Sequence, residues 1–213
     1  MSDPASTQPS RRRILPPYIV RRDFLPAAMV AELLAFAEAN EARFVSTKVG
    51  VGEGAATKPA VRISSMLRDF APLKDDFKAI MRPLAPAIAA ELKVKPFEVS
   101  RVEVELIAHG DGAFYSRHID TMREGDGTSK MRLLSGVYYF HAQPKAFEGG
   151  ALRLHELMPA RDDEARFVDI EPAHNSCVFF PSWMPHEVMP VRCPSKRFAD
   201  SRFAVNCWFR RAA

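Results

Sequence analysis

Apolar residues recur at helical spacing in the first part of the chain. An apolar stripe within Pro26–Ala42 predicts a helix, and its first residue, a proline, is suited to open it. The same spacing over residues 70–92 predicts a second helical region, in which Pro83 and Pro86 mark a break or kink. A short strand, Val61–Leu67, is expected between the two regions. We therefore interpret this part of the chain as scaffold.

The hydrophobic period changes at Glu98, where apolar and charged residues begin to alternate. This alternation, carried by Val102, Val104 and Leu106, is typical of a strand with one face in water. After the segment that carries His118, further strands are expected at Leu133–Phe140, Ala151–His155, Phe167–Ile170, Ser176–Phe180, His186–Met189 and Arg202–Phe209. About eight short strands with no helical stretch between them predict a mainly β fold, a double-sheet jelly roll or barrel.

This pattern predicts a single domain preceded by a tail. Residues 1–16 are expected to be disordered, and the domain is expected to span 17–213, with helical support over 17–97 and a β core over 98–210. The glycine-rich loop 46–60 is long enough to act as a lid. Small β cups of this kind bind ligands in their mouths.

Composition changes this picture little. The chain has 213 residues, 47% of them hydrophobic and 26% charged, which suits one soluble globular domain. Its 30 basic residues are largely offset by 26 acidic ones, and the excess gathers near the ends, which favours solvated termini over a nucleic-acid footprint. The three cysteines have no CxxC spacing, so they indicate neither a disulfide framework nor a zinc site. No run has the ~18 apolar residues of a membrane span, and no signal-peptide core is present, so we expect a cytoplasmic protein without membrane or nucleic-acid partners.

The candidate chemistry begins with a histidine and an aspartate in one extended segment. Side chains two positions apart on a strand share a face, about 7 Å apart along it, so His118 and Asp120 can hold neighbouring positions of a divalent metal. His186 is the best candidate for a third ligand. Two histidines and one carboxylate form the facial triad that favours non-haem Fe(II) and oxygen chemistry.

A facial triad leaves three positions on the metal, of which a 2-oxo acid can take two and dioxygen or water the third. The far carboxylate of such a co-substrate needs an anchor, and the planar fork of an arginine provides it best. Arg202 opens the final strand, which alternation places beside the strand of His186. Tyr139 can add a hydroxyl to the same carboxylate, and Leu152 can line the pocket.

These residues stand in a longer series of motifs. In order, the blocks are Arg-His-Ile-Asp, Gly-Val-Tyr-Tyr-Phe, Phe-Glu-Gly-Gly-Ala-Leu-Arg-Leu, Val-Asp-Ile-Glu-Pro, Phe-Phe-Pro-Ser, Pro-His-Glu-Val-Met-Pro-Val and Arg-Phe-Ala-Val-Asn-Cys-Trp. The series resembles the Fe(II)/2-oxoglutarate dioxygenases. It is most similar to their prolyl 4-hydroxylase branch, which includes the hypoxia-factor prolyl hydroxylases and their bacterial relatives. The resemblance covers roughly residues 99–210.

The resemblance carries expectations for the fold and for individual residues. It implies a double-stranded β-helix that binds Fe(II), 2-oxoglutarate and O2, with L-ascorbate as a further candidate cofactor. By position it implies the following roles: iron ligands, His118, Asp120 and His186; co-substrate anchor, Arg202; co-substrate contact, Tyr139; pocket walls, Leu152 and Trp208; residue beside the metal or substrate, Tyr115.

The chain also departs from the family pattern. Ala108 stands where the animal hydroxylases have a tyrosine, so one polar contact is expected to be missing. An insertion over 192–200 moves Arg202 further from His186 than is usual, and this makes Arg197 a rival anchor. The remaining histidines, which are expected to be exposed or structural rather than ligands, are His109, His141, His155 and His174.

Three classes of function compete. The first is an oxygenase that hydroxylates a carbon and releases succinate and CO2, with a peptidyl proline as leading substrate and a free amino acid or small metabolite as the alternative. The second is a nucleic-acid demethylase of the AlkB type, which has an arginine in place of Trp208. The third is a non-catalytic metal-binding or interaction module, which predicts a broken triad.

The charge of the loop 46–60 favours one kind of peptide substrate. Basic residues in and beside this loop, Lys48, Lys58 and Arg62, favour a substrate proline flanked by acidic residues.

Overall fold

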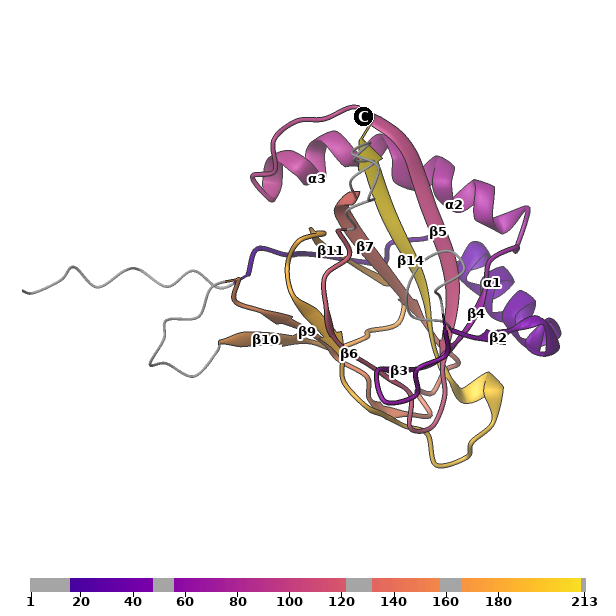
Figure 1. The fold of residues 1–213 in the computed structure, drawn as a ribbon. Coiled ribbons are helices and arrows are strands. Elements are labelled where there is room, and N and C mark those ends of the chain that lie inside the picture. The colour runs from indigo at the N-terminus through magenta and orange to yellow at the C-terminus, as the bar shows by residue number, and fades with distance from the viewer. Residues whose placement is uncertain (1–15, 48–55, 122–131, 158–165, 212–213) are drawn as a thin grey trace, which may run out of the picture.

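Two antiparallel sheets that face each other form the body of the protein (Figure 1). The computed structural model describes residues 16–47, 56–121, 132–157 and 166–211. The predicted tail, except for its last residue, and the middle of the loop 46–60 with Lys48 lie outside the described residues. The mainly β, jelly-roll-like architecture predicted from the alternation is confirmed.

The larger sheet has seven strands in the order β1-β11-β7-β14-β5-β4-β2. Its strands are β1 (Ile19–Arg22), β2 (Val45–Ser46), β4 (Ser65–Leu67), β5 (Val99–His109), β7 (Arg132–Phe140), β11 (Ser176–Pro181) and β14 (Arg202–Arg211). The smaller sheet has the order β10-β9-β12-β6-β3, with strands β3 (Arg62–Ile63), β6 (Phe114–His118), β9 (Leu152–His155), β10 (Phe167–Ile170) and β12 (His186–Val188). A further pair joins β8 (Glu148–Gly149) to β13 (Val191–Arg192).

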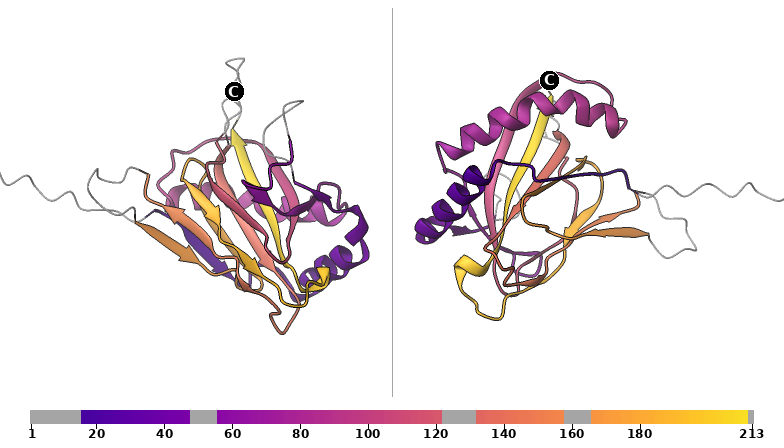
Figure 2. Two further views of the ribbon diagram at one scale, coloured as in Figure 1. Left: turned by 60° about the horizontal axis from the view of Figure 1, so that its bottom comes forward. Right: turned by 180° about the vertical axis from the view of Figure 1, so that it is seen from behind.

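The helices lie against one face of the larger sheet (Figures 1 and 2). They are α1 (Ala27–Ala39), α2 (Leu73–Met81) and α3 (Ala85–Glu91), with short 3-10 turns at η1 (Glu41–Arg43), η3 (Arg82–Leu84) and η4 (Phe198–Asp200). The predicted helix at Pro26–Ala42 is confirmed, although it ends at Ala39, where the side chain of Asn40 bonds back to the Phe36 carbonyl oxygen. The predicted break in the second region is confirmed at η3, which contains Pro83.

Two apolar clusters divide the faces of the larger sheet between them. One face packs on the helices, where Leu33 of α1 and Phe77 of α2 meet Leu106 of β5 in a single cluster. The other face turns to the smaller sheet, and there Tyr139 of β7 packs with Leu152 of β9. Alternation along each strand therefore sends one set of side chains to the helices and the other set into the space between the sheets.

Two expectations about strand pairing are wrong. The segment Val61–Leu67 is split into β3 and β4, which belong to different sheets, because the chain crosses from one sheet to the other there. The last strand, β14, does not lie beside β12; it lies at the centre of the larger sheet between β7 and β5. Arg202 therefore reaches the site from the opposite sheet to His186.

Within the residues that the structure describes, no helix combines the length and the apolar character needed to cross a membrane.

Candidate active site

A cavity of about 450 Å³ lies between the two sheets. The eight residues singled out in the sequence all line it: Tyr115, His118, Asp120, Tyr139, Leu152, His186, Arg202 and Trp208. They come from strands of both sheets or, for Asp120, from the turn just after β6. The fold thus gathers these residues around one space, while their individual roles stay predictions.

The two histidines and the aspartate converge on one point in the wall of the cavity. His118 and His186 are cross-strand neighbours on β6 and β12, and their ring centroids lie 4.2 Å apart. The Asp120 carboxylate oxygens lie 3.8 Å from His118 Nε2 and 3.5 Å from His186 Nε2. All the candidate ligand atoms fall within 4.8 Å of one another, a spacing that suits a single metal ion.

Each histidine is oriented by its own backbone. His118 Nδ1 lies 2.8 Å from the Ser116 carbonyl oxygen, and His186 Nδ1 lies 2.9 Å from that of Met184. A carbonyl can only accept a hydrogen bond, so in both rings Nδ1 carries the proton and donates. The lone pair is then on Nε2, the atom that faces Asp120. The tautomers required for metal ligation are fixed by the fold.

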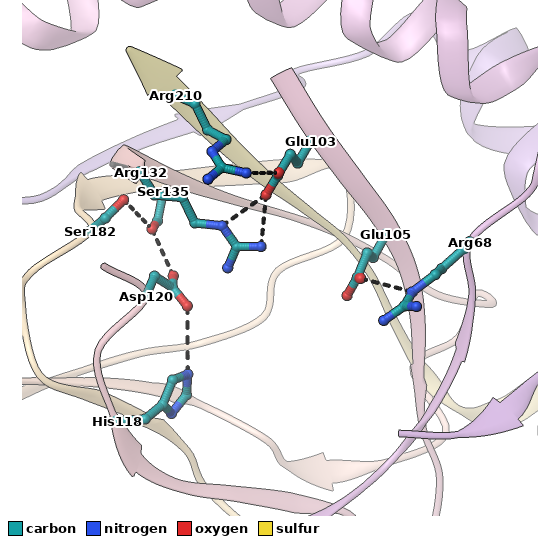
Figure 3. A network of polar contacts seen from close by, with 9 residues as sticks. All are labelled: Arg68, Glu103, Glu105, His118, Asp120, Arg132, Ser135, Ser182 and Arg210. Atoms are coloured by element: carbon teal, nitrogen blue, oxygen red, sulfur yellow. Dashed lines mark hydrogen bonds and ion pairs between the residues drawn. The ribbon is translucent and has the colours of Figure 1, made fainter. Parts of the chain in front are cut away.

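Asp120 is held by hydrogen bonds from the opposite sheet (Figure 3). Ser135 Oγ donates to Asp120 Oδ2 at 2.7 Å, and Ser135 Oγ lies 2.9 Å from Ser182 Oγ. Burial alone would raise the pKa of the Asp120 carboxyl; the neighbouring imidazoles and the hydrogen bonds from Ser135 and Trp208 outweigh it and hold the pKa below its ordinary value. Trp208, expected only as a pocket wall, thus also helps to keep Asp120 ionised.

A second polar group occupies the same cavity. Arg202 is 1% exposed, and its Cζ lies 4.7 Å from the centroid of the Tyr139 ring. Among the described residues, Arg202 Nε, Arg202 Nη2 and the Tyr139 hydroxyl have no hydrogen-bond partner. Buried polar groups are nearly always paired, so three unpaired donors together indicate a site for an anion. Burial raises the pKa of Tyr139 to about 12, which keeps its hydroxyl protonated and able to donate.

The two candidate anchors have different surroundings. Arg197, the rival, is exposed and paired with Asp200 at 2.9 Å. Gly150 has φ +71°, and a Cβ built on it would lie 2.6 Å from Arg202 Cδ. A glycine at this turn therefore leaves room for the Arg202 side chain.

His109 and Arg62 also line the cavity, which their places in the sequence did not predict. β5 extends to His109, which is 3% exposed and has its Nδ1 3.1 Å from Arg202 Nη1. Ala108, one position earlier, faces the helices, so His109 is the polar side chain that β5 supplies here. Arg62 lies over the Tyr115 ring at 4.6 Å, and this ring in turn stacks on His118 at 3.6 Å.

Of the other histidines, which were expected to be exposed or structural, His141 and His155 are buried, because each lies where a strand ends inside the fold. His155 Nε2 lies 2.9 Å from Glu187 Oε1.

We expect acid to destabilise the protein through its buried histidines. Burial first, and then repulsion from Arg202 and Arg62, holds the pKa of His109 well below its ordinary value. An unfolded histidine binds its proton near pH 6.5, so below about that pH the unfolded state gains protons first and the free energy of unfolding falls. Burial lowers the pKa of His118, to about 4, and that of His141, so both act in the same direction. Urea unfolding between about pH 7.5 and 5.5 should show this loss, and His109→Gln should lose less; equal losses would contradict the assignment.

Comparison with known proteins agrees with this arrangement. A family model described as the 2OG-Fe(II) oxygenase superfamily matches residues 104–210, half of the chain. An uncharacterized PKHD-type hydroxylase of Synechocystis sp. is 43% identical over 129 residues, which are 59% of this chain. The chain spans 42% of the length of that relative.

Solved structures share the fold over nearly the whole chain. A prolyl-4-hydroxylase from Pseudomonas putida superposes with a TM-score of 0.64 at 27% identity, covering 92% of this chain and 93% of the other. A prolyl hydroxylase from Trichoplax adhaerens, in complex with a hypoxia inducible factor oxygen degradation domain peptide fragment, gives 0.62 at 18% identity, covering 91% and 83%. A viral collagen prolyl hydroxylase from Paramecium Bursaria Chlorella virus-1, in its 2OG complex, gives 0.57 at 15% identity, covering 92% and 96%. The last two comparisons show the fold alone.

Proposed function

Because the chain belongs to the 2OG-Fe(II) oxygenase superfamily, we propose that it is an Fe(II)- and 2-oxoglutarate-dependent dioxygenase that hydroxylates a peptidyl proline. One observation carries this proposal. A single cavity is lined both by the cluster of two histidines and an aspartate and by Arg202 and Tyr139 with their unpaired donors. Together they match a metal chelated by a 2-oxo acid whose second carboxylate must be anchored.

The residues of the cavity fit both groups. His118 and His186 present Nε2 lone pairs, and Asp120 presents an ionised carboxylate, which is the donor set that Fe(II) prefers in oxygenases. The two free guanidinium nitrogens of Arg202 form a fork that can bind both oxygens of a carboxylate. When bound, Fe(II) and 2-oxoglutarate supply the oxidation: O2 gives one oxygen atom to the substrate carbon and one to 2-oxoglutarate, which leaves as succinate and CO2.

The protein contributes geometry and exclusion of water. Ser135 and the backbone carbonyls fix the ligand atoms before the metal arrives, which lowers the reorganisation that binding requires. Leu152, 1% exposed, lines the cavity from the smaller sheet. An apolar side chain that excludes water lowers the local dielectric constant, and this strengthens the pairing between Arg202 and a carboxylate. The Tyr115 ring stacks on His118 at 3.6 Å and so restricts the rotation of that imidazole.

The choice of a peptidyl proline over a free amino acid or small metabolite is supported by the similarity of the chain to the prolyl-4-hydroxylase from Pseudomonas putida. The test is mass spectrometry after incubation with Fe(II), 2-oxoglutarate and L-ascorbate, on proline-containing peptides and on a mixture of free amino acids. A mass increase of one oxygen atom on a peptidyl proline, with an equal amount of succinate, is the expected result. Oxidation confined to a free amino acid would move the function to small-molecule metabolism.

A further inference from the structure

The strand β5 extends beyond its neighbour on one side. The pairing of β4 with β5 reaches from Ser65 opposite Ala108 to Leu67 opposite Leu106. On the other side β14 pairs with β5 as far as Arg101 and beyond. In the described part of the chain, the segment Arg101–Glu105 therefore has a strand on one side only, and its other side has no strand partner.

A groove of about 270 Å³ lies along this open edge. All five residues from Arg101 to Glu105 line it, as expected where the edge of a strand, rather than one of its faces, borders a groove. Lys74 and Lys78 of α2 form part of its wall. Four residues line both this groove and the cavity of the candidate active site: Arg68, Glu105, Arg132 and Trp208. The groove therefore leads into that cavity.

The groove is positively charged. Its basic side chains are Arg68, Lys74, Lys78, Arg101 and Arg132, and its acidic side chains are Glu103 and Glu105. Both acids are paired (Figure 3): Glu103 lies 2.7 Å from Arg132 and 2.7 Å from Arg210, and Glu105 lies 3.2 Å from Arg68. Burial would raise the pKa of Glu103, but Arg132 and Arg210 lower this pKa overall. The Glu103 carboxylate is therefore ionised, and the two arginines balance its charge. Lys78 lies 2.9 Å from Asp75, so among the described residues Lys74 and Arg101 are the cations of the groove that form no ion pair.

We propose that the open edge of β5 at Arg101–Glu105 binds an extended, acidic segment of the protein substrate as an added strand. This inference rests on the proposed function, because it takes the substrate to be a peptide. The strand edge supplies main-chain pairing and the surrounding cations supply the preference for acidic side chains. The adjoining cavity receives the residue that is oxidised.

The chemistry of a strand edge favours a peptide over a nucleic acid. The edge presents alternating N–H and C=O groups, and a peptide backbone offers the matching donors and acceptors. A sugar–phosphate backbone would satisfy the lysines and arginines but gives the carbonyl groups of the edge few donors.

The test uses binding, which does not depend on turnover. The probe is a fluorescent aspartate-rich peptide without proline, added to the full-length protein. Lys78→Glu combined with Arg101→Glu should weaken its binding about tenfold or more. Arg22→Glu combined with Lys196→Glu is the matched control: it makes the same change in charge, at exposed residues that line neither cavity, and should change binding less than about twofold. Equal effects of the two double variants would overturn the proposal.

Two further probes separate the alternatives. The same peptide with alternate backbone nitrogens methylated keeps its charge but loses donors, so it should bind about tenfold more weakly; unchanged binding would exclude strand addition. A single-stranded oligonucleotide of equal charge should bind more weakly than the peptide; tighter binding would replace the peptide by a nucleic acid. Peptide binding without any proline hydroxylation would contradict the proposed function alone. Hydroxylation of proline peptides without any effect of the charge reversals would contradict this inference alone.

Discussion

The variant His186→Ala should lose Fe(II) binding and, with it, all turnover of 2-oxoglutarate. Removing one of three protein ligands leaves Asp120 and His118 to hold the metal. Even the outer partners of metal ligands contribute about 10–100-fold to affinity, so the loss of a ligand should exceed that range. Anaerobic titration with Fe(II) measures the affinity, and succinate release measures turnover.

The matched control for this variant is His174→Ala. His174 lies in a turn and does not line the cavity, so its removal should leave both measurements near the wild-type values. Parallel variants His118→Ala and Asp120→Ala should behave like His186→Ala. Full turnover by His186→Ala would remove the triad assignment, whatever the other variants do.

The variant Arg202→Ala should bind 2-oxoglutarate far more weakly while it keeps Fe(II). A carboxylate that enters this buried end of the cavity has the Arg202 fork as its counter-charge. Truncating one partner of a buried charge pair costs roughly 2–5 kcal/mol, which corresponds to about 30-fold to several-thousand-fold in affinity. The concentration of 2-oxoglutarate needed for half-maximal succinate release should rise by at least the lower figure.

Arg197→Ala is the control for the anchor, since it removes the same charge a few positions away. The Arg197 side chain is exposed, pairs with Asp200 and does not line the cavity, so the 2-oxoglutarate requirement should hardly change. Tyr139→Phe should have a smaller effect than Arg202→Ala, because it removes one neutral hydrogen bond, worth about 1 kcal/mol. A large effect of Arg197→Ala together with a small effect of Arg202→Ala would transfer the anchor to the insertion.

The residues of the candidate site could be found in the sequence because they lie in short local patterns. His118 and Asp120 are two positions apart, and the blocks around His186 and Arg202 keep their order along the chain. Which of Arg197 and Arg202 enters the cavity was not evident from spacing alone. The acidic residue three positions after Arg197 was a usable signal, since pairs at that spacing neutralise each other at the surface.

The parts of the fold that could not be predicted depend on pairing between distant segments. Alternation shows that a strand has two faces but not which strands flank it, so the central place of β14 was missed. For the same reason the pattern of Val61–Leu67 predicts one strand, although this segment contributes to two sheets. The place of His109 in the cavity could not be predicted, because the Gly-Asp-Gly that follows it is typical of a turn. In the structure β5 includes this histidine, and its side chain lines the cavity.

The central position of β14 has a consequence for how the chain folds. The contact between His109 and Arg202 joins residues 93 positions apart, and that between Glu103 and Arg210 joins residues 107 positions apart. Such distant pairs must close long loops before they gain any pairing energy, and domains built from them fold in milliseconds to seconds rather than microseconds. Until β14 docks, β5 and β7 each lack the strand that joins them, and such intermediates are prone to aggregate. The strand that carries the proposed co-substrate anchor therefore also governs how long the larger sheet stays open during folding.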